Sequence, residues 1–206
     1  HLDGQLLDTY KSLTRVFQMP ETEFFDRYTA QAPASTERGY REVWSIANAQ
    51  RSIPEHLPLS HAFVAGTLVP IIPAGSNIHF AILSAFRNWN FFGLDPSIAA
   101  YANVAAFGID GCLSTFIGHS VASTRKSFLV IGDLSFFYDM NAIGIRHVKN
   151  NARVILVNNQ GGGEFRLYDH AAERNFGEQA DVHIAAAGHF GAARSWVESM
   201  GWEYIA

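Results

Sequence analysis

Two apolar runs in the second half of the chain each end in side chains that carry oxygen. The run 127–131 leads through a glycine to Asp133, and the run 154–157 leads to Asn159, two residues before the glycines that start at Gly161. A carboxylate, an amide oxygen and a backbone carbonyl are hard donors. They suit Mg²⁺, which keeps several waters and binds through few carboxylates plus the phosphates of a ligand. The spacing therefore predicts a magnesium and phosphate site.

One β-α-β unit has to position these donors. Asp133 and Asn159 lie 26 positions apart, and the stretch between them, 136–148, has helical character. Because the carboxyl ends of parallel strands meet at one edge of a sheet, where ligands bind in open α/β folds, the two side chains are expected to be neighbours. Taken alone, Asp133 would be read as a helix cap, and Asn158 as a turn former.

The rest of the chain supports the same architecture. Expected strands cover 68–72, 98–101, 128–131, 154–157 and 203–205. Expected helices cover 22–28, 37–50, 77–86, 110–120, 136–148 and 182–200. From residue 51 onwards strands and helices alternate, which predicts an α/β fold with a parallel sheet and helices on both faces.

Composition excludes several classes of protein. With 48% apolar and 17% charged residues among 206, the chain is globular. A net charge of −4 without a Lys/Arg block argues against nucleic-acid binding. No apolar stretch reaches membrane-spanning length and no signal peptide is visible. The single Cys112 rules out an internal disulfide and fits a reducing compartment, so a cytoplasmic location is expected.

Three segments carry a resemblance to a known family. The pair Gly132-Asp133 followed by Asn159 is similar to the cofactor signature of thiamine diphosphate (ThDP)-dependent enzymes, although Leu134 stands where glycine is usual. The segments 132–141, 158–165 and 108–115 resemble, in the right order, the branch that contains the menaquinone-pathway synthases.

The resemblance implies a set of site residues. Asp133, Asn159 and the Gly161 carbonyl would hold Mg²⁺, and Mg²⁺ would bridge the diphosphate of ThDP. The implied cofactor-binding residues are Ser76, Asn77, Ile109, Gly132, Leu134, Ser135 and Gly162. In this reading Ser76-Asn77 lies in a turn between a strand and a helix, Ile109 supports the bent cofactor, and Ser135 donates to phosphate from a helix start.

Two departures from this branch concern its substrate. The branch uses one arginine four residues after its Gly-Asn-Ser turn and another after a later asparagine. On the expected turn at 75–77, those positions are Ala81 and Val104. Because arginine suits carboxylate recognition, the substrate is expected either to be less anionic or to be held by other groups, with Arg87 and Arg166 as the candidates.

The resemblance also implies what lies around this domain. Residues 1–50 are expected to be the tail of a central domain with a linker helix, or else a plain helical arm. Residues 51–206 would be the diphosphate-binding domain, cut at its C-terminus. An activating Glu would come from a pyrimidine-binding domain of the same or another chain, in a homodimer or homotetramer.

The expected reaction is decarboxylation of a small 2-oxo acid with transfer of the aldehyde unit to an acceptor; ligation and simple decarboxylation are not distinguished. A non-catalytic ThDP-fold assembly module is the alternative. A dinucleotide-binding domain ranks below both because the Gly-x-Gly-x-x-Gly turn is missing.

Overall fold

The computed structural model describes residues 6–31, 39–105, 108–167, 169–183 and 188–206. The chain divides into two compact units, His1–Ile53 and Pro54–Ala206. The division lies close to the boundary expected at residue 50, and the domain identities on either side of it stay predictions.

The first unit contains the two helices expected there. They are α1, Glu21–Gln31, and α2, Gly39–Ala49. Phe24 of α1 contacts the rings of Phe17, Phe25 and Tyr28. Neither helix has a buried residue, so apolar side chains of this unit are left largely exposed.

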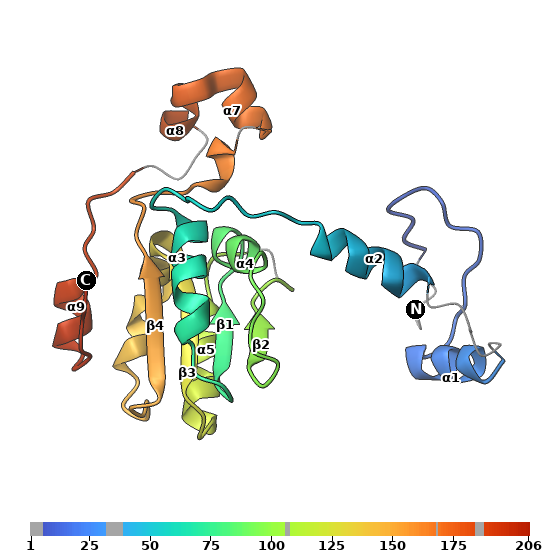
Figure 1. Cartoon of the computed structure of the whole chain (residues 1–206), viewed down its shortest axis with the longest axis horizontal. Coiled ribbons are helices and arrows are strands. Elements are labelled where there is room, and N and C mark those ends of the chain that lie inside the picture. The colour runs from blue at the N-terminus through green and yellow to red at the C-terminus, as the bar shows by residue number, and fades with distance from the viewer. Residues whose placement is uncertain (1–5, 32–38, 106–107, 168, 184–187) are drawn as a thin grey trace. The chain divides into compact units, whose positions relative to one another are not determined.

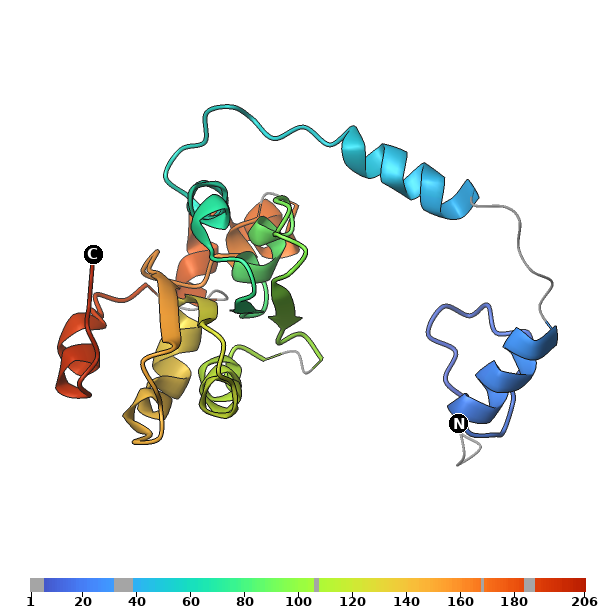
Figure 2. The ribbon, with the colours of Figure 1, turned by 60° about the horizontal axis from the view of Figure 1, so that its bottom comes forward.

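The second unit is built on a four-stranded parallel sheet with the order β2-β1-β3-β4. The strands are β1 Asn77–Phe80, β2 Ala99–Ala102, β3 Ser127–Gly132 and β4 Ala152–Val157. The helices around the sheet are α3 His61–Leu68, α4 Ser84–Trp89, α5 Cys112–Ala122 and α6 Asp133–Asp139. Figures 1 and 2 show α3 and α4 over one face and α5 and α6 over the other. The predicted α/β architecture is thus confirmed.

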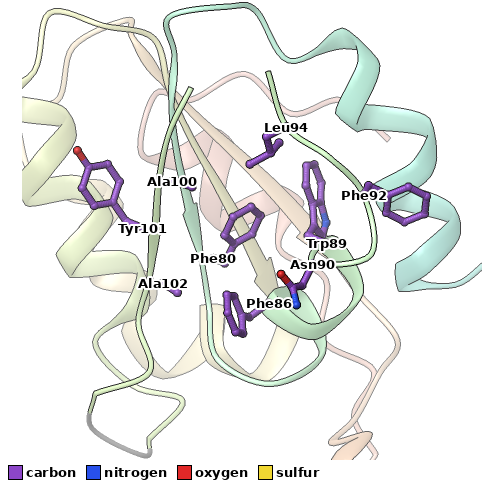
Figure 3. Close-up of a pocket in the computed structure, with 9 residues that line it drawn as sticks. All are labelled: Phe80, Phe86, Trp89, Asn90, Phe92, Leu94, Ala100, Tyr101 and Ala102. Carbon is purple, nitrogen blue, oxygen red and sulfur yellow. The ribbon is translucent and has the colours of Figure 1, made fainter. Parts of the chain in front are cut away.

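Alternating side chains of β1 show how the two faces are filled. Phe80 contacts Phe86 and Trp89 of α4, whereas His79 contacts Phe116 of α5. A small apolar pocket of about 200 Å³ lies between α4 and β2 (Figure 3). Its lining residues are Phe80, Phe86, Trp89, Asn90, Phe92, Leu94, Ala100, Tyr101 and Ala102. Burial on both faces explains why β3, at the centre of the sheet, reads as a continuous apolar run.

Two expected elements ahead of β2 are wrong. The expected strand 68–72 is the end of α3 followed by a 3₁₀ turn, Val69–Ile71, because Pro70 has no N–H for a central strand. The expected helix 77–86 is instead strand β1, a turn at 81–83, and α4. The expected helix places Asn77 at its start and His79 within it, but both residues lie in β1, the buried strand between β2 and β3.

Three further expectations fail towards the C-terminus. The helix expected at 136–148 ends at Asp139 and continues only as a 3₁₀ helix, Met140–Gly144. The helix expected at 182–200 is not continuous. Its described residues form the end of α8, Ala180–His183, then a non-helical stretch at 188–193, and then α9, Arg194–Ser199. No strand forms at 203–205. The other elements are 3₁₀ helices Glu164–Arg166 and Gly177–Gln179 and helix α7, Ala171–Phe176.

No helix in the described part of the chain combines the length and apolar character needed to cross a membrane.

Candidate functional site

The candidate site lies at the carboxyl edge of the sheet, where the strand order changes direction. From β1 the chain passes to β2 on one side and then to β3 on the other. The ends of β1 and β3 therefore flank a topological switch point, the usual place for a ligand in an open α/β sheet. Asp133 follows β3 directly, and the loop after β4 lies beside it.

Asp133 is the best-defined residue of this edge. It is the first residue of α6 and only 2% exposed. Its Oδ1 accepts the N–H of Leu134 at 2.7 Å, and its Oδ2 accepts the N–H of Gln160 at 2.6 Å. A buried carboxylate is costly unless hydrogen bonds compensate it, so these donors keep the acid at the edge of the sheet.

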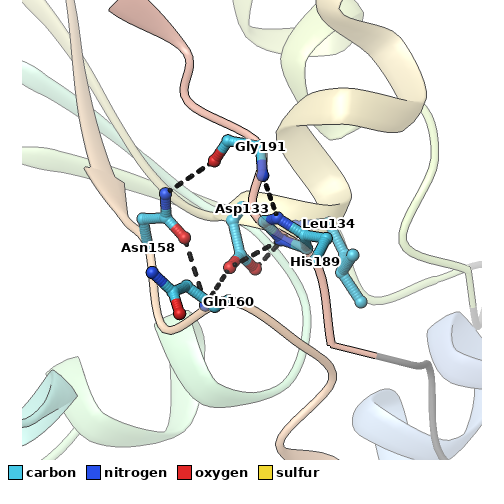
Figure 4. A network of polar contacts seen from close by, with 6 residues as sticks. All are labelled: Asp133, Leu134, Asn158, Gln160, His189 and Gly191. Carbon is cyan, nitrogen blue, oxygen red and sulfur yellow. Dashed lines mark hydrogen bonds and ion pairs between the residues drawn. The ribbon is translucent and has the colours of Figure 1, made fainter.

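The loop after β4 is folded back onto Asp133 (Figure 4). Gln160 has a φ of 64°, a left-handed conformation that is uncommon for a residue with a side chain. This conformation accompanies an N–H that points at both Asp133 and the side-chain oxygen of Asn158, 3.1 Å away. Asn159 is exposed and Gly161 and Gly162 are partly exposed, and all three belong to the loop that Gln160 joins to Asp133.

Two histidines near Asp133 were missed from the sequence. His189 places its Nε2 3.1 Å from Asp133 Oδ2. His61, the first residue of α3, has a buried Nδ1 without a hydrogen-bond partner. Burial lowers the pKa of His61, and the negative charge of Asp133 partly opposes this. The glycines around His189, inside an Ala-rich stretch, were the available signal for a loop.

The structure joins two other predicted residues. Ser135 is buried, and its hydroxyl donates to the carbonyl of Ile109. The loop before α5 is thereby tied to the start of α6. Gly132 and Leu134 flank Asp133 and are partly buried. The hydroxyl of Ser135 is used inside the protein, so its backbone N–H remains the group suited to a phosphate.

Ser76 and Asn77 do not belong to this edge. They lie before and at the start of β1, at the opposite end of the strand from the turn that faces the switch point. The side-chain amide of Asn77 donates to the hydroxyls of Ser123 and Ser127 at 2.9 and 3.2 Å. The structure therefore corrects the expected strand-to-helix turn at 75–77 and gives Asn77 a structural role.

The turn that does follow β1 is apolar. It consists of Ala81, Ile82 and Leu83, and Leu83 has a φ of 69°. Four residues after this turn stands Arg87, so the corrected turn puts an arginine where the resemblance expects one. Arg87 donates to Glu164 at 2.5 Å. The first arginine position of the branch thus falls on Arg87 and not on Ala81, whereas the second position is still Val104.

Arg166 forms ion pairs and a hydrogen bond with residues that follow it in the chain. It lies 3.2 Å from Glu173 and 3.8 Å from Asp181, and it donates to the carbonyl of Gly177. These contacts bind together the helical segment 164–183. Arg166 is therefore a structural cation of that segment, and Arg87 is the better candidate for a substrate carboxylate.

The donor set fits a hard divalent cation. Among the residues that the structure describes, no three His, Cys, Asp or Glu side chains gather as a metal site. What the edge offers is one buried carboxylate beside a loop with an exposed asparagine and partly exposed glycines. This is the chemistry that Mg²⁺ accepts when a phosphate supplies further oxygens.

Comparison with known proteins agrees with the resemblance. No family model matches the chain. It is 34% identical over 203 residues to 2-succinyl-5-enolpyruvyl-6-hydroxy-3-cyclohexene-1-carboxylate synthase of Bacteroides fragilis, which covers 98% of this chain and 36% of the relative. The synthase of Bacteroides thetaiotaomicron is 35% identical over 205 residues, covering 98% and 35%. The chain thus spans about a third of the length of these relatives.

A solved structure was also matched. Rhodococcus jostii RHA1 thiamine diphosphate-dependent 4-hydroxybenzoylformate decarboxylase is 16% identical with a TM-score of 0.48, over 74% of this chain and 28% of that one. The sequence matches carry the assignment: along almost its whole length, this chain belongs to the thiamine diphosphate-dependent enzyme family.

Proposed function

We propose that this chain supplies the diphosphate- and cation-binding part of a ThDP-dependent enzyme that decarboxylates a 2-oxo acid and transfers the aldehyde unit to an acceptor. The observation that carries the proposal is the buried carboxylate of Asp133, held against the loop that contains Asn159 and Gly161. When bound, ThDP supplies an electron sink that stabilises the carbanion left by loss of CO₂.

The residues of the chain bind and orient. Asp133, the Asn159 side chain and the Gly161 carbonyl would hold Mg²⁺. The backbone around Leu134, Ser135 and Gly162 would face the diphosphate, helped by the N-terminal end of α6. Ile109, fixed through its carbonyl by Ser135, would support the cofactor. We infer that an activating Glu comes from a pyrimidine-binding domain of the same or another chain, in a homodimer or homotetramer.

The substrate is inferred from the turn after β1. Arg87 offers a guanidinium to one carboxylate of the substrate. This substrate carboxylate would replace Glu164, the present ion-pair partner of Arg87. Ile82 and Leu83 give the turn no polar side chain, and Val104 replaces the second arginine. A 2-oxo acid with a largely apolar remainder, or an acceptor with fewer carboxylates than the synthase branch uses, fits this arrangement.

Calorimetric titration of the chain with ThDP tests the proposal. With Mg²⁺ we expect saturable binding, and in the presence of a chelator we expect its loss. Asp133→Asn keeps an acceptor for the Leu134 N–H but lacks the charge, so affinity should fall tenfold or more, on the order of the effects seen for metal-site residues. Asp169→Asn, a highly exposed acid paired with Arg174, is the control and should bind as the wild type does.

Two results would contradict the proposal. Binding that is independent of both Mg²⁺ and Asp133 would remove the cation site. Absence of any ThDP binding, in a chain shown to be folded by circular dichroism, would favour a non-catalytic assembly module.

A further inference from the structure

Residues 189–191 form a strap over the candidate cation site. The N–H of His189 donates to the carbonyl of Gln160 at 3.0 Å, and the Asn158 side-chain amide donates to the carbonyl of Gly191 at 3.3 Å. The imidazole of His189 meets Asp133 Oδ2 at 3.1 Å between these two anchors (Figure 4). The strap is thus joined both to the loop after β4 and to the acid itself.

The tautomer of His189 follows from its second contact. The N–H of Gly191 donates to Nδ1 of His189 at 3.0 Å, so Nδ1 is an acceptor and carries no proton. In a neutral imidazole the proton then sits on Nε2. Nε2–H is therefore the donor and Oδ2 the acceptor. In this form His189 has no lone pair to offer a cation at Asp133.

Packing fixes the strap in this position. The ring of His189 lies edge-on against Phe137 of α6, with centroids 5.1 Å apart. A Cβ added at Gly191 would come within 3.2 Å of both Phe137 and the His189 Nδ1. Only a residue without a side chain passes here comfortably. Phe190 between them is 99% exposed and takes no part in the contact.

His189 occupies the Asp133 oxygen that faces the loop containing Asn159 and Gly161. This oxygen is Oδ2, which also accepts the Gln160 N–H. A carboxylate oxygen has two lone pairs, and Gln160 and His189 use both. A cation bound at Oδ2 would therefore need the lone pair that His189 occupies.

We propose that His189 is a built-in competitor of the divalent cation: its imidazole caps Asp133, and cation binding displaces it and releases the strap. The inference rests on the proposed cation site and adds a conformational step to it. It predicts that removal of His189 tightens cation binding, the opposite of what a supporting residue would do.

The test compares Mn²⁺ binding by the full chain and its variants, read from the electron paramagnetic resonance signal of free Mn²⁺, with Mg²⁺ as competitor. His189→Ala should bind Mn²⁺ about tenfold more tightly, the scale of one hydrogen bond to a charged group. His189→Gln, whose amide N–H can still reach a carboxylate oxygen, should return towards the wild-type affinity. Phe190→Ala is the matched control and should leave the affinity unchanged.

A second readout follows the strap directly. Amide hydrogen exchange at His189 and Gly191 should be slow in the metal-free wild type and faster with saturating Mg²⁺, because the N–H groups lose their acceptors. In His189→Ala the exchange of Gly191 should be fast with or without Mg²⁺.

The outcomes separate the two proposals. Measurable Mn²⁺ binding with equal or weaker affinity in His189→Ala overturns the strap and leaves the cation site standing. Slower exchange of Gly191 on addition of Mg²⁺ also overturns the strap. Absence of Mn²⁺ binding in every variant, His189→Ala included, overturns the cation site and the strap together.

Discussion

Acid should destabilise the second unit through His79, a buried imidazole that is not part of the candidate site. His79 is 8% exposed, its Nε2 lies 2.6 Å from Nδ1 of His119, and its ring stacks on Tyr101 at 4.8 Å. The pKa of His79 is lowered from 6.5 to about 4, mainly by burial and secondly by the positive charge of His119. Among the residues that the structure describes, no carboxylate forms an ion pair with the ring to offset this.

The sign and size of the effect follow from linkage. The unfolded chain takes up a proton at this residue near pH 6.5, whereas the folded chain resists protonation until about pH 4. Stability is therefore fully present above pH 6.5 and falls as the pH drops through the window between these values. From neutral pH to about pH 5, the loss attributable to His79 is about 2 kcal/mol.

Urea unfolding at a series of pH values measures this loss. His79→Gln is the informative variant, because its amide can still form a hydrogen bond with His119 but does not titrate. On acidification to about pH 5, the wild type should lose about 2 kcal/mol more of its unfolding free energy than the variant, because only the wild type carries an imidazole whose protonation folding opposes. Parallel curves for the two proteins across this range would refute the reasoning.

Two further substitutions test the corrected fold. Asn77→Ala removes the amide that donates to Ser123 and Ser127, so it should lower the unfolding free energy measured by urea titration by about 1–2 kcal/mol. The ThDP affinity should stay unchanged, because Asn77 lies at the opposite end of β1 from the candidate site. A specific loss of ThDP binding would contradict this structural role. Asn151→Ala removes one amide that donates to the carbonyls of Ser120, Ser123 and Arg125, so a loss of about 2–3 kcal/mol is expected in the same assay, and a change below about 0.5 kcal/mol would mean that water replaces it fully.

The strands that flank Asp133 were predictable because their physics is local. The continuous apolar runs of β3 and β4 have only one stable environment, a sheet covered on both faces. Asp133 follows from the run that precedes it and from the resemblance. The loop after β4 was recognisable by its asparagines and glycines.

The failures have a common origin in residues whose neighbours are distant in sequence. Asn77 and His79 read as the first turn of a helix until Ser127 and His119, which lie fifty and forty positions away, are placed beside them. Misplacing β1 also moved the following turn, and so put the first arginine position of the branch at Ala81 instead of Arg87. The contact between His189 and Asp133 joins segments that no periodicity relates, so only the folded chain reveals it.

The pairing of β1 has a consequence for how the protein acquires its structure. This strand hydrogen-bonds to β2 and β3, and β3 in turn to β4, so the central strand waits for partners that emerge much later from the ribosome. High contact order of this kind slows folding and leaves unpaired strand edges and apolar side chains exposed in the meantime. A nascent chain that has not yet reached Val157 cannot complete its sheet, so its exposed strands are open to association with other chains until β4 is added.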